Sequence, residues 1–246
     1  MSAALHLIET LAECERATLS ELSRRAGFTH NQTFRLLATF EDAGYVVRGP
    51  DKAYRLGAKL HLLGRQAAWP HELIESSAAA LDELAELSGE TALLSVPAET
   101  DRMIVDARAS RYSLRVMYSI GSRLPLYVGG MGVAMLAFSP PELQAQMLGA
   151  PRRAYTPQTL VDTAALQAEL ASVRHGGVRI SRDDYALGEF SVAAPIIGGN
   201  GWACGALNIA GFTARLDSDT ERRYIVAVKE AAQKVTAALS RITPLP

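Results

Sequence analysis

The sequence has little cysteine and no long apolar segment. Cys14 and Cys204 are the only cysteines in 246 residues, and neither has a neighbour at metal-ligand spacing. This usage favours a reducing compartment, free buried thiols and no structural zinc. No apolar run approaches the roughly 18 residues that span a bilayer, and the N-terminus lacks the basic and apolar segments of an export signal. We therefore expect a soluble cytoplasmic protein.

Residue clusters that carry catalysis are also missing. The five histidines are scattered at positions 6, 30, 61, 71 and 175 without ligand spacing. Asp183 and Asp184 suggest a metal or acid–base pair, but no second cluster supports them and we expect both to face solvent in a loop. The stretch 129–132 lacks the third small residue of a dinucleotide fingerprint, because Met135 stands there, and it has no P-loop lysine. We expect no catalytic residue, no metal and no cofactor.

The chain is rich in apolar residues, and its charge is unevenly placed. Apolar residues make up 48% of the sequence, enough for one or two sizeable cores, and the length favours two domains. The net charge is -1, yet eight Lys or Arg stand against four acids between Arg16 and Lys59, whereas residues 61–246 carry 17 against 19. DNA binding requires such a local surplus of positive charge, although a surplus of four is modest.

Three short helices are predicted in the first 44 residues. A first helix follows from four apolar residues on one helical face, Ala4, Leu7, Ile8 and Leu11. The spacing of Thr18 from Glu21, and of Thr29 from Gln32, is that of a helix N-cap, and it starts helices near residues 19 and 30. Glycines at 27 and 44 are placed to end them. The third helix is expected to bury Thr33, Leu36, Leu37 and Phe40 and to expose Asn31, Gln32, Arg35 and Thr39.

A hairpin should follow these helices. Residues 45–48 and 53–56 are β-compatible and flank a turn at 49–51, which predicts the wing of a winged helix-turn-helix. In such a domain the third helix here would enter the major groove, where Asn and Gln pair with adenine and Arg with guanine or phosphate. The candidate DNA contacts are Thr29, His30, Asn31, Gln32, Thr33 and Arg35 on the helix and, for the flanking backbone, Arg48, Lys52 and Arg55 on the wing.

The remaining chain predicts a linker and a second domain. Leu60, Leu63 and Ala67 continue one helical face until Trp69-Pro70, where the proline should break a linker helix. Helices are expected over 71–88, 129–138, 140–148 and 163–174 and from Ser218 onward, and strands over 90–97, 102–109, 113–118, 177–182, 190–197 and 202–210. The order indicates an α+β fold with an antiparallel sheet. The predicted domains are 1–57, a linker over 58–70, and 71–246.

These motifs resemble the IclR family of bacterial regulators over essentially the whole chain. The N-terminal part of the resemblance lies in residues 19–28, 33–45 and 54–57. The C-terminal part lies in Leu124-Pro-Leu-Tyr127, Gly130-Met-Gly132, Ala193-Ala-Pro-Ile196 and residues 205–211. Together these segments are fairly specific, whereas each alone would suit many proteins.

The resemblance implies a GAF-like effector-binding domain, a homodimer or homotetramer, and control of catabolic operons by small, often acidic metabolites. Either repression or activation is compatible with it. Carried over by motif, the residues lining the effector site are Leu124, Gly130, Met131, Ser181, Ser191, Asn208 and Ala210. Amides near Gly130 and Met131 at a helix start would hold a carboxylate, because free N–H groups and the helix dipole favour an anion.

The chain departs from the family pattern at several of these positions. Tyr127 and Gly129 stand where relatives often have His and Ser, and Val133 replaces the usual Lys. Relatives that bind very small keto acids have an acidic residue at the position of Ser181 and serine at that of Ala210. Fewer hydrogen bonds then offset the desolvation of a very small acid, so a larger, partly apolar acid is the better expectation. A rival hypothesis is a small-molecule enzyme or binding module fused to a DNA-binding domain.

Overall fold

The computed structural model describes residues 2–66 and 68–240, and the contacts between residues divide the chain into two compact units, 1–68 and 69–246. No helix among the described residues is long and apolar enough to cross a membrane. Both cysteines are free and half-buried.

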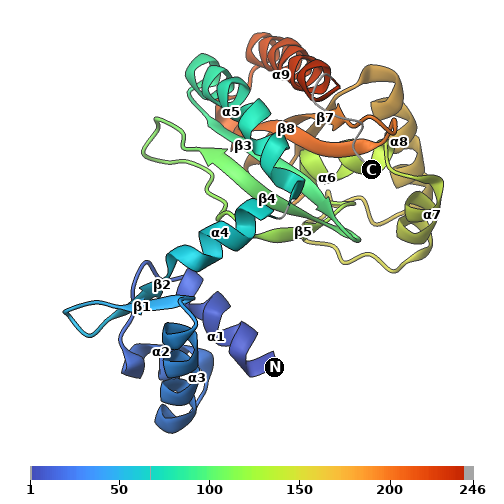
Figure 1. The fold of residues 1–246 in the computed structure, drawn as a ribbon. Helices are drawn as coiled ribbons and strands as arrows, with labels where there is room; N and C mark the ends of the chain where they lie inside the picture. The colour runs from blue at the N-terminus through green and yellow to red at the C-terminus, as the bar shows by residue number, and fades with distance from the viewer. Residues whose placement is uncertain (1, 67, 241–246) are drawn as a thin grey trace. The chain divides into compact units, whose positions relative to one another are not determined.

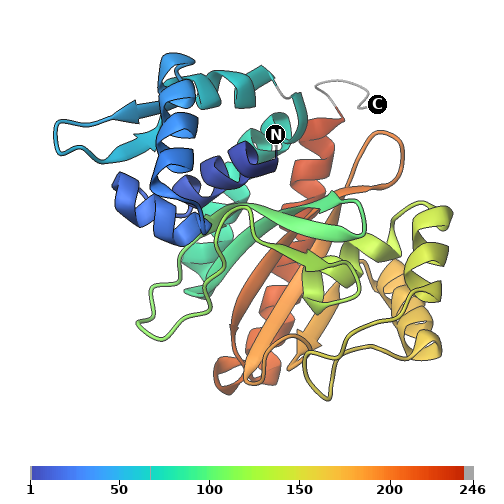
Figure 2. The ribbon, with the colours of Figure 1, turned by 90° about the horizontal axis from the view of Figure 1, so that it is seen from below.

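The first unit consists of three helices, a two-stranded hairpin and a further helix (Figure 1). Its elements are α1 (Ser2–Ala12), α2 (Leu19–Ala26), α3 (His30–Asp42), β1 (Val46–Arg48), β2 (Tyr54–Leu56) and α4 (Ala58–Gln66). Its core is a cluster of buried apolar side chains from α1, α2, α3 and the hairpin that includes Leu7, Leu22, Leu37 and Val46. The hairpin extends away from α1–α3 (Figure 2), as a wing does.

The capping residues predicted from the sequence set the ends of α2 and α3. Thr18 accepts a hydrogen bond from the Glu21 amide while the Glu21 carboxylate accepts from the Thr18 amide, which completes a capping box. Thr29 caps α3 by accepting from the Gln32 amide at 3.3 Å. Gly27 has a φ of 68°, the left-handed conformation that ends a helix without strain.

The second unit packs helices on both faces of one sheet. Its helices are α5 (Ala68–Ser88), α6 (Gly129–Ala137), α7 (Pro141–Gly149), α8 (Thr163–Gly176), the short 3-10 helix η1 (Thr213–Arg215) and α9 (Ser218–Leu239). Its strands are β3 (Thr91–Ala98), β4 (Asp101–Arg108), β5 (Arg123–Pro125), β6 (Arg179–Arg182), β7 (Glu189–Ile197) and β8 (Ala203–Phe212). The strands lie in the order β5-β4-β3-β8-β7-β6, and every neighbouring pair is antiparallel.

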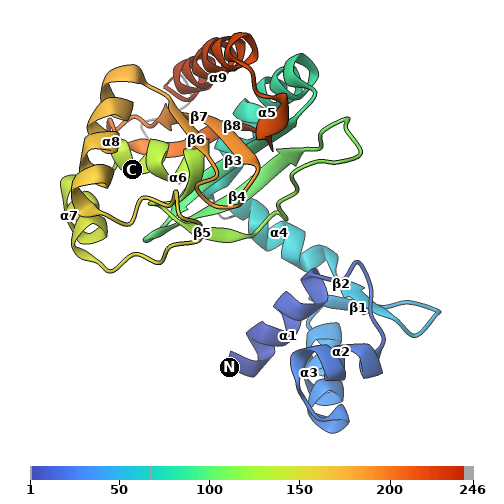
Figure 3. The same ribbon diagram turned by 180° about the vertical axis from the view of Figure 1, so that it is seen from behind.

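Two apolar cores lie on opposite faces of this sheet. One joins the sheet to α5 and α9 through residues such as Leu81, Ile209 and Val228. The other joins it to α6 and α8 through residues such as Met135 and Leu170. Figures 1 and 3 show α5 and α9 covering one face and α6 the other. The predicted α+β class with an N-terminal winged helix-turn-helix is confirmed.

Two local predictions are wrong. Residues 113–118 form no strand, and the strand paired with β4 is β5, which begins at Arg123. The linker helix α4 ends at Gln66, before the proline, but the next helix starts earlier than the expected residue 71, since α5 begins at Ala68 and places Pro70 in its first turn. A proline is tolerated there because a first-turn N–H has no intrahelical acceptor to lose. Residue 67, which was assigned to the apolar face of the linker helix, lies outside the described residues.

Candidate DNA interface and ligand cavity

The first turns of α3 present an exposed polar face. Asn31, Gln32 and Arg35 are all exposed and line one shallow surface groove together with Phe34 and Thr39. The Thr39 hydroxyl donates to the Arg35 carbonyl at 3.0 Å and is thereby held against the helix. The face therefore carries amide and guanidinium groups that are free to reach base edges.

Two predicted DNA contacts on α3 need correction or refinement. Thr33 is fully buried and its hydroxyl donates to the Thr29 carbonyl at 3.0 Å, so it belongs to the core and cannot reach DNA. His30 is exposed, but its Nε2 lies 3.2 Å from the Ser20 hydroxyl on α2, which ties the ring to the preceding helix. Phe34, which the sequence reasoning did not single out, is 52% exposed and is suited to contact a thymine methyl.

All three predicted wing cations are exposed. Arg48 ends β1 with its guanidinium 5.4 Å from the centre of the Tyr54 ring, and Arg55 lies on β2. Lys52 occupies the turn with a φ of 59°, and its amide donates to the Gly49 carbonyl at 3.0 Å. The hairpin thus presents three positive side chains of the kind that bind phosphate.

Six of the seven proposed effector residues line one cavity of the second unit. Gly130 and Met131 come from α6, Ser181 from β6, Ser191 from β7, and Asn208 and Ala210 from β8. The seventh, Leu124, is half-buried on β5 opposite Arg102 and does not line the cavity. The cavity offers only about 20 Å³ to the centres of water molecules, enough for one or two waters.

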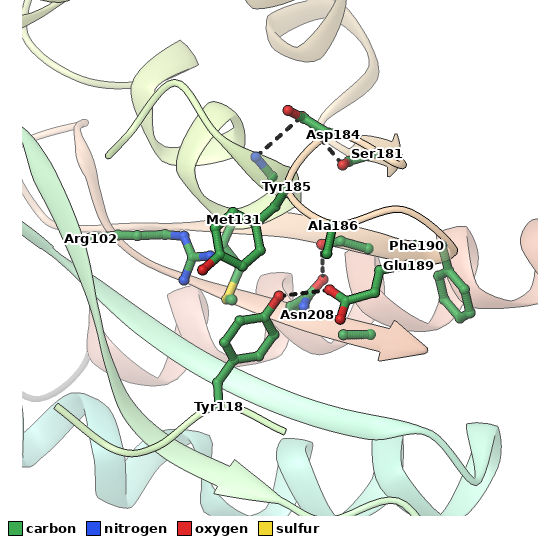
Figure 4. A pocket seen from close by; sticks show the side chains of 14 residues that line it. Arg102, Tyr118, Met131, Ser181, Asp184, Tyr185, Ala186, Glu189, Phe190 and Asn208 are labelled. Carbon is green, nitrogen blue, oxygen red and sulfur yellow. Dashed lines mark hydrogen bonds between the residues drawn. The ribbon is translucent and has the colours of Figure 1, made fainter. Parts of the chain in front are cut away.

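The sequence reasoning missed Arg102, the cavity's most unusual residue. It lies on β4 with 3% of its surface exposed, and its side chain points toward Met131 and Tyr185 (Figure 4). Among the described residues its Nε and Nη1 have no hydrogen-bond partner, and it forms no ion pair within 4.0 Å. Burial lowers the pKa of the guanidinium to about 10, so it remains charged at neutral pH. A buried cation without a counter-ion beside a cavity favours an anion there.

The N-terminus of α6 adds a second anion-binding feature. The Gly129 amide donates to Asp184 Oδ2 at 3.2 Å, whereas no acceptor within residues 2–66 and 68–240 contacts the amides of Gly130 and Met131. Gly130 also allows α6 to approach β7 closely, since a Cβ there would lie 2.2 Å from Ser191 Oγ. Two free amides at a helix start favour a bound carboxylate.

The prediction that Asp184 faces solvent is wrong. It is 2% exposed, its Oδ2 accepts from the Ser181 hydroxyl at 3.3 Å, and Arg179 lies 3.8 Å away. Burial raises the pKa of this carboxyl, and Arg179 opposes the shift. Asp183 is half-buried and accepts from the Gly188 amide at 2.5 Å. The acidic pair therefore holds the β6–β7 turn against α6 and forms no acid–base site.

The end of the cavity away from Arg102 carries hydrogen-bonding groups. The Tyr118 hydroxyl donates to Glu189 Oε2 at 2.9 Å, and the Ser191 hydroxyl donates to Asn208 Oδ1 at 2.6 Å (Figure 4). Burial raises the pKa of the Glu189 carboxyl, although the Tyr118 hydrogen bond works against the shift. The cavity is thus polar at both ends, and its lining also includes the apolar residues Met131, Phe190 and Ala210.

A winged helix-turn-helix followed by a separate α+β domain is the architecture of a ligand-responsive transcription regulator. Two family models match the chain: the IclR helix-turn-helix domain over residues 3–50 and the bacterial transcriptional regulator IclR C-terminal domain over residues 66–237. The chain belongs to the IclR family, as the sequence motifs predicted.

Relatives and solved structures agree with this assignment over nearly the full length. The chain is 30% identical to the transcriptional repressor IclR of Escherichia coli, over 95% of this chain and 87% of the relative. It is 29% identical to the regulator KdgR of the same organism, over 94% and 89%. A crystal structure of an IclR regulator from Alicyclobacillus acidocaldarius is 25% identical and superimposes with a TM-score of 0.80 over 97% of each chain. An IclR homologue from Microbacterium hydrocarbonoxydans, solved with 4-hydroxybenzoate, shares the fold at 21% identity with a TM-score of 0.83 over 98% of each chain.

Proposed function

We propose that this protein controls a catabolic operon by binding operator DNA as a homo-oligomer, and that a small organic carboxylate bound in the cavity changes its affinity for that DNA. It would act in the bacterial cytoplasm. The observation that carries the ligand proposal is Arg102, a buried guanidinium without an anion among the described residues. The repressors among its relatives favour repression as the mode of control.

The exposed face of α3 and the three wing cations support the DNA-binding half of the proposal. Gln32 and Arg35 would contact base edges, while Lys52 would contact phosphate. A single winged helix covers too little DNA for specific control, whereas two recognition helices read paired half-sites. Leu62 and Leu63 on α4 are 61% and 42% exposed, which offers an apolar surface for a second copy.

Arg102 and the α6 amides support the carboxylate half. A carboxylate between them would satisfy two guanidinium nitrogens and the two amides of Gly130 and Met131 together, and charge-assisted hydrogen bonds of this kind are the strong ones. The 4-hydroxybenzoate bound by the Microbacterium homologue is an acid of the expected size class. Apolar residues in the lining, Met131 and Ala210 among them, favour a ligand with a carbon skeleton over an inorganic anion.

The DNA-binding proposal is tested by titrating DNA from the intergenic region upstream of the protein's own gene. Arg35→Ala and Gln32→Ala should each weaken specific binding by about 1–3 kcal/mol if they contact bases. Lys52→Ala should cost less and reduce the salt dependence, because it removes only a phosphate contact. Glu142→Ala, an exposed change on α7, is the control and should leave the affinity unchanged. Unchanged affinity in both α3 variants at fixed salt would contradict the assignment of α3 as the recognition helix.

A further inference from the structure

The cavity is polar at two separate ends, and this separation constrains the ligand beyond its carboxylate. Arg102 supplies a cation from β4, and Glu189 supplies an acceptor from the first residue of β7. The two side chains form no ion pair within 4.0 Å, and Tyr118 lies between them (Figure 4). If Arg102 binds the carboxylate, as the proposed function holds, Glu189 faces a part of the ligand several bonds away.

The Glu189 carboxylate accepts only one hydrogen bond from the described part of the chain, from the Tyr118 hydroxyl at 2.9 Å. No Lys or Arg lies within 4.0 Å of its carboxylate there, and the donor that it has in the free protein, a phenol, is neutral. Asn208 also lines the cavity, and its Oδ1 accepts from the Ser191 hydroxyl at 2.6 Å, which leaves its amide nitrogen as a donor. A hydroxyl group of a ligand could donate to Glu189 as the phenol of Tyr118 does, and it could accept as well.

Tyr118 also takes up part of the cavity. It belongs to the irregular connection between β4 and β5, and its ring lies in the cavity with the centroid 6.1 Å from that of Tyr185. Space of about 20 Å³ for water centres admits no organic acid, so a ligand must displace a side chain. A ligand hydroxyl that takes the place of the phenol on Glu189 exchanges one hydrogen bond for another and leaves no buried acceptor unpaired.

We propose that the ligand is a hydroxy acid whose hydroxyl is remote from its carboxylate, with the carboxylate on Arg102 and the hydroxyl donating to Glu189 in place of Tyr118. An acid without the hydroxyl would displace Tyr118 and strand the Glu189 carboxylate. An ω-amino acid would place a strongly hydrated cation with three N–H donors where the displaced phenol had a single O–H donor, so it fits less well. The cavity should therefore prefer a hydroxy acid over the same acid without the hydroxyl and over the same acid with an amino group in its place.

Calorimetry on the full-length protein tests this with matched triplets of acids. The probes are 4-hydroxybutanoate, butanoate and 4-aminobutanoate, the same series with one and two more methylenes, and 4-hydroxybenzoate, benzoate and 4-aminobenzoate. At least one hydroxy acid should bind about 10- to 100-fold more tightly than its two counterparts, as expected when a buried acceptor is otherwise left unpaired. Glu189→Leu should remove this preference, and Glu189→Gln, which keeps an acceptor oxygen, should retain most of it.

Tyr118→Phe gives an independent test with the opposite sign. The variant removes the donor that competes with the ligand and leaves Glu189 unpaired in the free protein, so hydroxy acids should bind more tightly while the acids lacking the hydroxyl gain less. Near-identical gains for both would overturn the inference.

The outcomes separate this inference from the proposed function. Equal binding of hydroxy and unsubstituted acids that is lost in Arg102→Met leaves the carboxylate proposal standing and overturns the hydroxyl assignment. Preference for the amino acids overturns it as well. If no triplet has a member that binds the wild-type protein, both proposals fail.

Discussion

Gly130→Ala offers a direct test of how closely α6 approaches the sheet at the ligand cavity. A Cβ at this position would lie 2.2 Å from Ser191 Oγ, 3.1 Å from Ser191 Cβ and 3.2 Å from Ala193 Cβ. The hydroxyl of Ser191 can rotate away, but this breaks its 2.6 Å hydrogen bond to Asn208. The two carbon contacts then require α6 and β7 to separate by a few tenths of an ångström.

The expected cost follows from these two terms. Losing one side-chain hydrogen bond costs about 1 kcal/mol, and modest overpacking in a close-packed core brings the total to about 1–3 kcal/mol. For a domain of this size each kcal/mol lowers the melting temperature by roughly 2–4 °C. Ligand affinity should fall too, because the added methyl and the displaced Ser191 both change the cavity wall.

Urea unfolding and calorimetry with the cognate acid measure both effects. Gly149→Ala is the matched control, since a Cβ at the end of α7 meets nothing within 4 Å and alanine favours a helix over glycine by up to about 1 kcal/mol. The double variant Gly130→Ala/Ser191→Ala removes the shortest contact and should recover part of the stability. A Gly130→Ala protein with wild-type stability and ligand affinity would refute the close approach.

Three further predictions concern assembly, ion pairing and pH. Leu63→Glu places a charge on the exposed apolar face of α4 and should shift the protein toward smaller species in light scattering; a wild-type protein that is only monomeric at micromolar concentration would contradict the oligomer. Arg215→Met strands the buried Glu90 carboxylate, which Arg215 Nη2 contacts at 2.7 Å, and should cost about 3–5 kcal/mol in urea unfolding. Arg222→Met, which breaks a fully exposed pair, should change stability by less than about 1 kcal/mol, and equal costs for the two would refute the role of burial. Burial raises the pKa of Glu189 in the folded protein, so this carboxyl lowers the free energy of unfolding as pH rises from about 4.3 through that raised value. Glu189→Gln should remove this loss of stability, and parallel plots of stability against pH for variant and wild type would contradict the prediction.

The sequence predicted best the features that local chemistry determines. The capping pair Thr18 and Glu21 set the start of α2, and five of the six strands expected in the second unit are present. It failed at residues 113–118, where the composition suits a strand but the edge of β4 pairs instead with β5 from Arg123. Strand formation depends on an available partner, which the local pattern does not encode.

The cavity shows the same limit for side chains. Its small residues could be placed by motif, but Arg102 has the appearance of an ordinary exposed strand cation, and Asp184 that of a loop acid. Both are buried because segments distant in sequence pack around them: Tyr118 and Tyr185 lie near Arg102, and Gly129 of α6 contacts Asp184. Burial of a charge is a property of the tertiary fold, so the local sequence could not mark these two residues as part of the cavity.

A carboxylate bound in the cavity should alter DNA binding. Fluorescence anisotropy of labelled operator DNA, measured with and without the acid, tests this most directly. A saturating acid should change operator affinity by about 5- to 150-fold, the usual range of coupling between two sites. Ala210→Trp, which fills the cavity from β8, should bind the operator like the wild type but no longer respond. Wild-type affinity that is unchanged by an acid bound at the cavity would contradict the account, as would an Ala210→Trp protein that still responds fully.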